Sequence, residues 1–402
     1  MTIPQEELRS LSREQSERLV SVRRDLHRHP ELGFTETRTA ARIAETLARL
    51  GIPHRTGVAK TGVLATIRGT GRGANGDGRA VLLRADMDGL PLSELNEVPY
   101  RSESDGMMHA CGHDGHVSIL LGAAELLHAT RDRWAGTIRL AFQPGEEGFG
   151  GAVPLIEQGA LADPDCGSAF ALHIWNSLPV GTIGIRPGPA MAAVDEFTIT
   201  VVGRGGHASE PFATADPIVA TAAVVGALQT IVSRNLDAQD AAVCTVGSMH
   251  GGTTHNIIPE RAELVGTLRS FRPEVREILR RRVTEISEGI AASYGCRAAV
   301  NLHPGYPATV NDGAMSALAT RAAAGVVGDG KVTPAKPVMG GEDFSYFLQK
   351  VPGAMMFLGS ANAERGLAHP HHSPRFDFDE ACLPTGVELM CSVALRALAE
   401  GP

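Results

Sequence analysis

The sequence predicts a two-domain α/β protein in which a small α+β domain interrupts a larger α/β domain. First, the chain has 402 residues, which is more than a single hydrophobic core usually organises. Second, short apolar strands alternate with helical periods near both ends of the chain. Third, the middle of the chain follows the order βαββαβ. We therefore expect residues 1–188 and 305–402 to form one domain, with residues 189–304 inserted into it.

The first part is predicted to begin with helix and to continue with strands and loops. Apolar residues recur at helical spacing over residues 14–50, with a break at His29-Pro30. The glycine-rich loop of residues 69–78 lacks G-K-[ST] and a following helix, so we expect a flexible hairpin there instead of a phosphate-binding loop. The other predicted elements are strands over residues 62–68, 80–85, 137–142 and 169–174 and a helix over residues 117–129.

The inserted domain is predicted to be a ferredoxin-like sandwich. Its strands are expected over residues 197–202, 242–249, 262–270 and 297–303, and its helices over residues 216–232 and 273–294. The α/β pattern then resumes with a helix over residues 315–327, a strand over 354–358 and a closing helix over 384–398. We predict that the connections near residues 185–190 and 305–310 act as a hinge that closes the inserted domain over the active site.

Composition and charge exclude several classes of partner. The net charge of -8, from 37 basic and 45 acidic residues, leaves no positive field to concentrate nucleic acid or anionic lipid. The N-terminus lacks an apolar leader, and we find no uninterrupted apolar span of transmembrane length. The six cysteines are scattered, without a C-x-x-C pair or a disulfide framework. We expect a cytoplasmic protein that binds neither nucleic acid nor membrane.

A cluster of candidate metal ligands lies in the segment His109-Ala-Cys-Gly-His-Asp-Gly-His116, just before a predicted helix. Cysteine and histidine are good ligands for divalent transition metals. Because only one residue separates Cys111 from His113, a turn into the helix can direct both side chains toward one ion. A solvated polar turn with one buried cysteine explains the same residues about equally well.

Two adjacent carboxylates, Glu146 and Glu147, follow a predicted apolar strand in Gln143-Pro-Gly-Glu-Glu-Gly148. Neighbouring side chains in a loop can diverge, so one carboxylate can bind a metal while the other acts as a general base. An exposed acidic turn is the alternative interpretation.

Histidines later in the chain complete the candidate set. His173 lies inside an apolar strand, where a buried imidazole needs a partner, although a core hydrogen bond would also satisfy it. The loop His369-Pro-His-His-Ser-Pro374 supplies two adjacent imidazoles. The donors available for a two-metal site are therefore Cys111, His113, Glu147, His173 and one of His371 or His372.

Three further side chains are candidates for supporting roles. Asp86 and Asp88 follow another predicted strand, where they can orient a ligand imidazole or simply cap a turn. His207 lies in the glycine-rich turn Gly203-Arg-Gly-Gly-His-Ala-Ser209, where it can donate a hydrogen bond to a developing oxyanion.

Seven motifs in sequence order carry a family resemblance. They are DLHRHPELGF (25–34), RADMDGLP (84–91), MHACGHDGH (108–116), QPGEEG (143–148), GRGGHAS (203–209), GGEDFS (340–345) and HSPRFDF (372–378). Together they resemble the metallo-exopeptidase and aminoacylase family, in its branch of hippurate hydrolases, auxin-conjugate hydrolases and related N-acyl-amino-acid amidohydrolases. The resemblance spans nearly the whole chain. It implies a mixed-sheet catalytic domain and an inserted domain that forms a homodimer.

The resemblance also implies roles for single residues. It implies that Glu146 is the catalytic base, that Asp88 supports the metal site and that His207 reaches the active site of the partner subunit. Asp86 stands where many relatives have histidine, so it receives no ligand role, and the bridging ligand is left unassigned. The implied ligands of two divalent metals are Cys111, His113, Glu147, His173 and His372. Mixed sulfur, nitrogen and oxygen donors suit manganese or zinc, and also cobalt or nickel.

The predicted reaction is hydrolysis of the amide bond of an N-acyl amino acid, such as hippurate or an N-acetyl amino acid. Two cations would lower the pKa of a shared water, Glu146 would take its proton and later protonate the leaving amine, and His207 would polarise the carbonyl. Asn256 and Arg269 are predicted to hold the substrate carboxylate, with a structural salt bridge equally open for Arg269. The alternatives are a dipeptidase or carboxypeptidase of the same family, or a non-catalytic binding protein.

Overall fold

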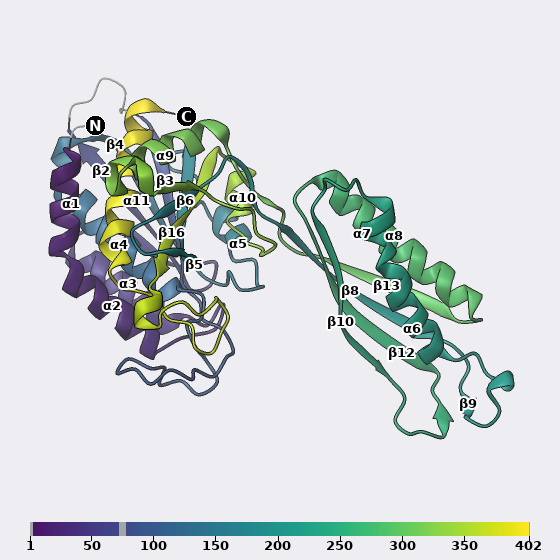
Figure 1. The fold of residues 1–402 in the computed structure, drawn as a ribbon. Coiled ribbons are helices and arrows are strands. Elements are labelled where there is room, and N and C mark those ends of the chain that lie inside the picture. The colour runs from purple at the N-terminus through teal and green to yellow at the C-terminus, as the bar shows by residue number, and fades with distance from the viewer. Residues whose placement is uncertain (1–2, 72–77, 402) are drawn as a thin grey trace. The chain divides into compact units, whose positions relative to one another are not determined.

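The computed structural model describes residues 3–71 and 78–401, which divide into two compact units (Figure 1). Unit 1 comprises Met1–Ala190, Val310–Lys336 and Asp343–Pro402, and unit 2 comprises Met191–Thr309 and Pro337–Glu342. The short segment 337–342 thus belongs to unit 2, although the sequence boundaries placed it in the first domain. The strands β7 (Gly188–Met191) and β14 (Thr309–Asn311) contain two points where the chain passes between the units. Hinge motion at these points stays a prediction.

Unit 1 is built on a mixed eight-stranded sheet with the order β1-β2-β4-β3-β5-β16-β6-β15. The central strands β4, β3, β5 and β16 run parallel to one another, whereas β2 is antiparallel to β1 and β4, and β6 is antiparallel to β16. Parallel strands buried on both faces are apolar along their length, and β3 is buried at every position. The strands are β1 His54–Val58, β2 Gly62–Thr70, β3 Ala80–Asp86, β4 Ala135–Gln143, β5 Ser168–Pro179, β6 Ile183–Ile185, β15 Val332–Pro334 and β16 Gly353–Ala361.

Helices pack against this sheet to form the core of unit 1. The helices α4 and α11 are apolar around most of their circumference, as expected for buried helices, and they pack against each other and against β3 (Figure 1). The α-helices are α1 Gln5–Glu14, α2 Ser16–Arg28, α3 Thr37–Arg49, α4 His113–Ala129, α5 Ala152–Glu157, α9 Gly313–Val327, α10 Ser345–Leu348 and α11 Cys382–Glu400. Short 3-10 helices lie at η1 Arg131–Arg133, η3 Asp329–Lys331 and η4 Ala363–Arg365.

Several sequence predictions for unit 1 need correction. The predicted hairpin of residues 69–78 is wrong, because β4 lies between β2 and β3 in the sheet; residues 72–77 themselves lie outside the described part of the chain. The helix predicted over residues 14–50 with a break at His29-Pro30 is confirmed as α2 and α3, which lie on either side of that break, but α1 and β1 were not predicted. We expected no apolar span of transmembrane length, but α11 is long and apolar enough to cross a membrane by length and composition alone. Most of this helix is buried inside the unit.

Unit 2 has the predicted ferredoxin-like topology. Its four-stranded antiparallel sheet has the order β10-β12-β8-β13, and the helices α6 and α8 pack on each other and on this sheet. The strands are β8 Ala193–Val202, β10 Ala242–Gly251, β12 Arg261–Ser270 and β13 Arg297–Pro304, and the helices are α6 Pro217–Leu228, α7 Thr230–Asn235, α8 Pro273–Ser293 and the 3-10 helix η2 Pro211–Ala213. A separate two-stranded ribbon joins β9 (Gly206–His207) to β11 (Ile257–Ile258).

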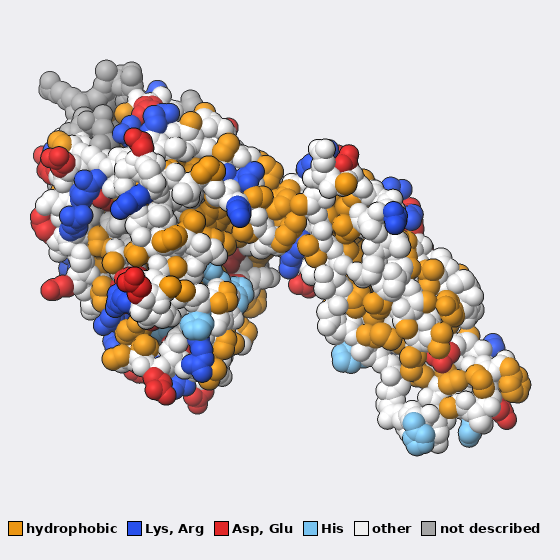
Figure 2. Space-filling view, viewed as in Figure 1, with side chains coloured by type: hydrophobic (Ala, Val, Ile, Leu, Met, Phe, Trp, Pro, Cys, Tyr) orange, Lys and Arg blue, Asp and Glu red, His pale blue; other side chains and the backbone are white. Residues whose placement is uncertain are grey.

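Large apolar side chains are exposed on unit 2. They include Phe212, Val219, Met249, Ile257 and Val265, and the space-filling view shows hydrophobic side chains spread over this unit (Figure 2). Exposed apolar surface of this kind often marks a contact with another protein.

Candidate metal centre

The candidate site lies in unit 1, at one edge of the parallel part of the sheet. The strands β3 and β4 run in parallel, with Asp86 paired to Gln143 at their last residues. Because the carboxyl ends of parallel strands lie at the same edge, the segments that follow these strands meet there. One segment carries Asp88 and the other carries Glu146 and Glu147.

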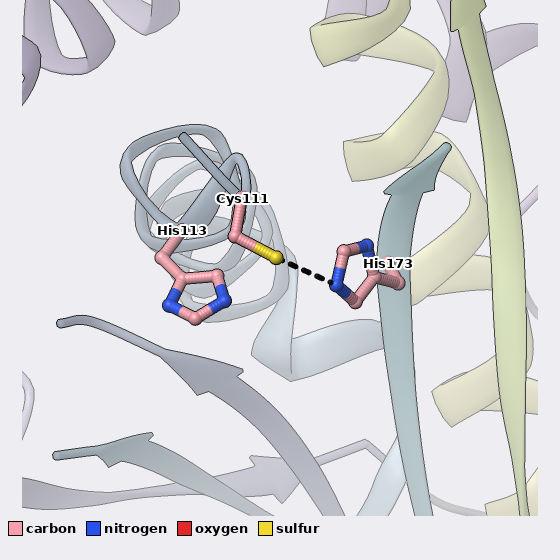
Figure 3. A group of neighbouring side chains, drawn as sticks. All are labelled: Cys111, His113 and His173. Carbon is pink, nitrogen blue, oxygen red and sulfur yellow. Dashed lines mark hydrogen bonds between the residues drawn. The ribbon is translucent and has the colours of Figure 1, made fainter. Parts of the chain in front are cut away.

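A tight turn delivers Cys111 and His113 to this edge. Gly112, between them, has φ +90°, a conformation that other residues rarely adopt, and a Cβ there would lie 3.3 Å from Cβ of Ile174. The next residue, His113, begins α4. Figure 3 shows the Cys111 sulfur pointing toward His173 of β5, and Sγ lies 3.5 Å from Nε2 of His173.

The structure brings all five predicted ligands and Glu146 together. Three groups with donor atoms within 4.8 Å of one another consist only of these residues: Cys111, His113 and His173; Cys111, Glu147 and His372; and His113, Glu146 and Glu147. Glu147 Oε1 lies 3.2 Å from Nε2 of His372 and 3.9 Å from Nε2 of His113. Cys111, His113 and Glu147 each belong to two of these groups. His113 has only Nε2 facing the cluster, so the thiol of Cys111 and the carboxylate of Glu147 are the side chains placed to be shared by two ions.

Hydrogen bonds fix which nitrogen of each imidazole faces the cluster. His173 Nδ1 donates to the backbone oxygen of Ile174 at 2.7 Å, which leaves Nε2 toward Cys111. His113 Nδ1 donates to the backbone oxygen of Asp88 at 2.9 Å, and its buried Nε2 has no hydrogen-bond partner among the described residues. Histidines that bind metals are typically held in this way, with one nitrogen donating to a carbonyl or carboxylate.

Asp88 holds two parts of the site at once. Its side-chain oxygens accept the backbone N–H groups of Glu146 at 3.1 Å and Glu147 at 3.0 Å, while its backbone oxygen orients His113. The predicted supporting role therefore has a geometric basis, and it includes the turn that carries the candidate base.

Asp86 is also engaged. Its side chain pairs with Arg84, and it accepts a hydrogen bond from Nδ1 of His116 at 2.6 Å. Both of these partners are buried, so the Asp86 carboxylate interacts with them and not with solvent. Asp86 also forms, with His113 and His116, a group whose donor atoms lie within 4.8 Å of one another, so its lack of a ligand role stays a prediction.

The electrostatics of the cluster favour a positive charge. Burial opposes protonation of His113, but the Asp86 and Asp88 carboxylates outweigh it and raise the pKa of His113 to about 10. Burial, together with the Glu147 and Glu146 carboxylates, raises the pKa of the Cys111 thiol well above its ordinary value. A buried thiol among carboxylates ionises only when a cation compensates it. The donor set, the orphaned His113 nitrogen and this excess of negative charge all fit divalent metal ions.

The two adjacent histidines, of which the family resemblance implies His372 as the ligand, make different contacts. His371 Nε2 donates to the backbone oxygen of Ile174 at 2.8 Å, and burial lowers the pKa of His371 to about 4. His372 instead belongs to the group with Cys111 and Glu147. Because His372 and not His371 shares such a group among the described residues, we assign His371 no ligand position.

In unit 2, the predicted residues fall at two places. His207 pairs with Ile257 across the β9–β11 ribbon, and Ala208 N–H donates to the backbone oxygen of Asn256 at 3.1 Å, so His207 and Asn256 are neighbours. Arg269 pairs with Val194 near the other end of β12. Its Nη1 is buried without a partner in the described part of the chain, and burial lowers the pKa of its guanidinium. The structural salt bridge left open for Arg269 receives no support.

The sequence did not identify the polar groups that hold the site in place. Arg23 of α2 is fully buried and pairs with Asp114 of α4 at 2.9 Å and with Asp377 at 2.7 Å. Glu36 accepts the N–H of Gly145 at 2.8 Å, next to the candidate base. Both Arg23 and Glu36 lie in or beside helices, and only their burial, which a single sequence does not reveal, distinguishes them from surface charges.

Comparison with known proteins settles the family. Residues 82–396 match the model of peptidase family M20/M25/M40. The chain belongs to this family. An N-acetyl-L-cysteine deacetylase of Bacillus subtilis is 41% identical over 94% of this chain and 88% of its own length. An IAA-amino acid hydrolase of Arabidopsis thaliana is 40% identical over 95% of this chain and 85% of its own length. The resemblance inferred from the motifs is confirmed, and the chain is a hydrolase.

Two further relatives bear on substrate and metal. A thermostable carboxypeptidase of Saccharolobus solfataricus is 40% identical over 97% of this chain and 98% of its own length. The crystal structure of a dinuclear metal-binding M20 peptidase of Bacillus subtilis matches with a TM-score of 0.81 and 35% identity, over 96% of this chain and 99% of that chain. The mixed α/β fold predicted for the chain is therefore that of the M20 peptidases.

Proposed function

We propose that this M20 hydrolase cleaves the amide bond of N-acyl amino acids, with two divalent metal ions bound in unit 1. The observation that carries this proposal is the convergence of the candidate ligands and Glu146, which come from four distant segments and lie within bonding reach of shared ions. The names of two relatives, an N-acetyl-L-cysteine deacetylase and an IAA-amino acid hydrolase, support the substrate class.

The metals would be held by Cys111 and His113 at the start of α4, His173 on β5, and Glu147 and His372 on loops. Cys111 and Glu147 are our candidates for the shared ligand. Bound divalent ions would supply Lewis-acid polarisation of the substrate carbonyl and a water of lowered pKa. Manganese or zinc are the proposed ions, with cobalt or nickel as alternatives that mixed donors also accept.

Glu146 is the proposed base and acid. It is buried, and its carboxylate lies within 4.8 Å of donor atoms of His113 and Glu147, beside the proposed ions. The Asp88 side chain accepts the backbone N–H of Glu146, so the backbone that carries the Glu146 carboxylate is held in place. In this proposal Glu146 takes a proton from the attacking water and returns it to the leaving amine.

Unit 2 supplies the proposed substrate contacts. His207 Nδ1 accepts the N–H of Ser209 at 3.1 Å, and because a backbone N–H can only donate, the proton of a neutral His207 sits on Nε2. That N–H can donate to a developing oxyanion. Asn256 and Arg269 are the proposed partners of the substrate carboxylate. Because they lie apart in the unit, they would reach one carboxylate together only if they came from different subunits.

We also propose that the chain forms a homodimer through unit 2. The exposed apolar side chains of this unit support an interface, and β10 lies at the edge of its sheet. In such a dimer His207 would serve the active site of the partner subunit. A cytoplasmic location is a further proposal, supported by six free cysteines, since reducing compartments keep thiols unpaired.

A carboxypeptidase is the second candidate function, because the Saccharolobus relative that carries this name is 40% identical. Both reactions cleave an amide next to a free carboxylate, and they differ in whether the acyl side carries a free amine. Hydrolysis of hippurate and N-acetyl amino acids should exceed that of matched dipeptides by at least tenfold in kcat/KM. Preference for the dipeptides would replace the first function with the second.

A further inference from the structure

Two imidazoles share one carbonyl oxygen beside the candidate metal centre. The backbone oxygen of Ile174 accepts a hydrogen bond from His173 Nδ1 at 2.7 Å and another from His371 Nε2 at 2.8 Å. A carbonyl oxygen has two lone pairs, so it can satisfy both donors. The N–H of the same residue donates to Nε2 of His116 at 2.8 Å, which holds the peptide from its other side. Ile174 is therefore fixed by three imidazoles.

His371 is held in one orientation by aromatic neighbours. Its ring lies 4.8 Å from the ring of Trp175 and 4.9 Å from that of Phe376, at angles of 31° and 37°. It meets His173 edge-on, with centroids 5.2 Å apart. Since a carbonyl oxygen can only accept, Nε2 of His371 carries its proton and offers no lone pair to a metal.

The residue that follows is a candidate ligand in a strained conformation. His372 has φ +62°, a left-handed conformation that non-glycine residues rarely adopt. Its backbone N–H donates to the oxygen of Ala110 at 2.8 Å, next to Cys111. With the His371 ring attached to β5 and the His372 N–H attached to the Cys111 turn, the chain has little freedom between these two points. The His372 side chain is thereby directed to Glu147.

We propose that His371 is a positioning residue of the metal centre, which through the Ile174 carbonyl fixes His173 and His372 relative to each other. The inference rests on the proposed metal-dependent function. His371 would touch neither metal nor substrate. Its hydrogen bond, more than its packing, would set the geometry of two ligands that are 199 positions apart, His173 on the strand and His372 on the loop.

The test separates the hydrogen bond from the packing. His371→Phe keeps an aromatic ring between Trp175 and Phe376 but removes the donor, whereas His371→Gln restores an N–H at a similar distance from the backbone. Asn176 still anchors the loop in both variants, because its Nδ2 donates to the oxygens of His369 and Asp377. His369→Phe is the matched control, since it changes an exposed ring in the same loop.

Manganese affinity, measured by competition with a chelator, is the first measurement, and the visible spectrum of the cobalt-substituted protein is the second. We expect His371→Phe to weaken affinity by about 10- to 100-fold, the usual effect of losing such a partner. We also expect it to alter the cobalt spectrum, with His371→Gln recovering most of the affinity and His369→Phe unchanged. Circular dichroism of the metal-free variants reports whether each one folds.

Two results would overturn the inference while leaving metal dependence intact. If the Phe variant binds manganese as tightly as the parent, the hydrogen bond has no positioning role. If the Gln variant loses as much affinity as the Phe variant, the imidazole itself matters and His371 is a ligand or a packing residue. A parent protein that binds no divalent ion would instead contradict the proposed function.

Discussion

The two units hold their candidate chemistry in opposite ways. In unit 1 the donors come from four distant segments, and buried partners such as Asp88 and the Ile174 carbonyl fix their orientation. In unit 2 His207 and Asn256 lie exposed at a short ribbon, and the hydrogen bonds of the His207 ring are with Ser209, two residues along the chain. The candidate donors of the buried centre all come from unit 1, whereas the exposed pair can only act on something that lies outside the ribbon.

The largest expected effect is a loss of turnover when Glu146 of the buried centre is changed. Glu146→Gln should lower kcat by about 10²- to 10⁴-fold, because it removes the group proposed to move the proton. The metal content, measured by elemental analysis, should stay at the parent value. The exposed Glu157→Gln is the control, and it should retain activity. Turnover retained by the Glu146 variant would remove this residue as the base.

The ion pairs behind the centre should dominate its stability. Asp114→Asn removes a charged partner of the buried Arg23. The free energy of unfolding, measured by urea titration, should therefore fall by about 3–5 kcal/mol. The Arg23 charge and the His27 hydrogen bond outweigh burial and hold the pKa of Asp114 far below its usual range. Because the folded-state pKa is depressed, this stabilisation is present above pH of about 4 and is lost on acidification.

Asp114→Asn should therefore also flatten the loss of stability between about pH 5 and pH 2. The exposed Asp132→Asn serves as the control, with an expected change within about 0.5 kcal/mol. If both variants unfold at the same urea concentration as the parent, the buried pair contributes nothing to the unit.

A change at the exposed His207 should lower the rate of catalysis without changing the metal content. His207→Ala should lower kcat by about 10²- to 10³-fold, as for loss of one oxyanion donor, while metal content is unchanged. Mixing inactive Glu146→Gln with inactive His207→Ala after dissociation and reassociation should return part of the activity, because a mixed dimer would contain one intact site. Absence of any recovery would argue that His207 serves its own subunit or no site at all.

The smallest expected effect concerns the hydroxyl of Ser209. Ser209→Ala removes the contact between Oγ and His207 Nδ1 at 2.7 Å but keeps the backbone N–H. We expect a loss of only a few-fold in kcat, of the size of one neutral hydrogen bond. Nitrogen NMR of His207 should still show the proton on Nε2. A proton found on Nδ1 in the parent would break the assignment of His207 as a donor.

How far the sequence could predict the molecule differs between the units. The ferredoxin-like order of unit 2 was predictable because its strands and helices follow one another in the order βαββαβ, which is typical of this fold, although β8 pairs with the distant strands β12 and β13. In unit 1 the hairpin between β2 and β3 was wrong, because β4 from much later in the chain inserts between them. Pairing between distant strands leaves no mark on the sequence around either strand.

The site shows the same limit. Cys111, His113 and Glu147 were predictable because their residue types bind metals and the motifs occur in a recognisable order. Residue types alone left His371 and His372 open, and only the motif HSPRFDF implied His372, since the contact of the His371 ring with the Ile174 oxygen depends on the fold. The sequence did not indicate that Arg23 and Glu36 are buried beside the site, because a charged residue in or beside a helix is usually solvated.

The most direct test of the central claim is a metal titration of the chelated protein, with hydrolysis of N-acetyl amino acids followed at each step. We predict that the metal-free protein is folded but inactive, that it binds two manganese or zinc ions per chain, and that activity returns as they bind. Full hydrolysis by protein that contains no divalent ion would contradict the account.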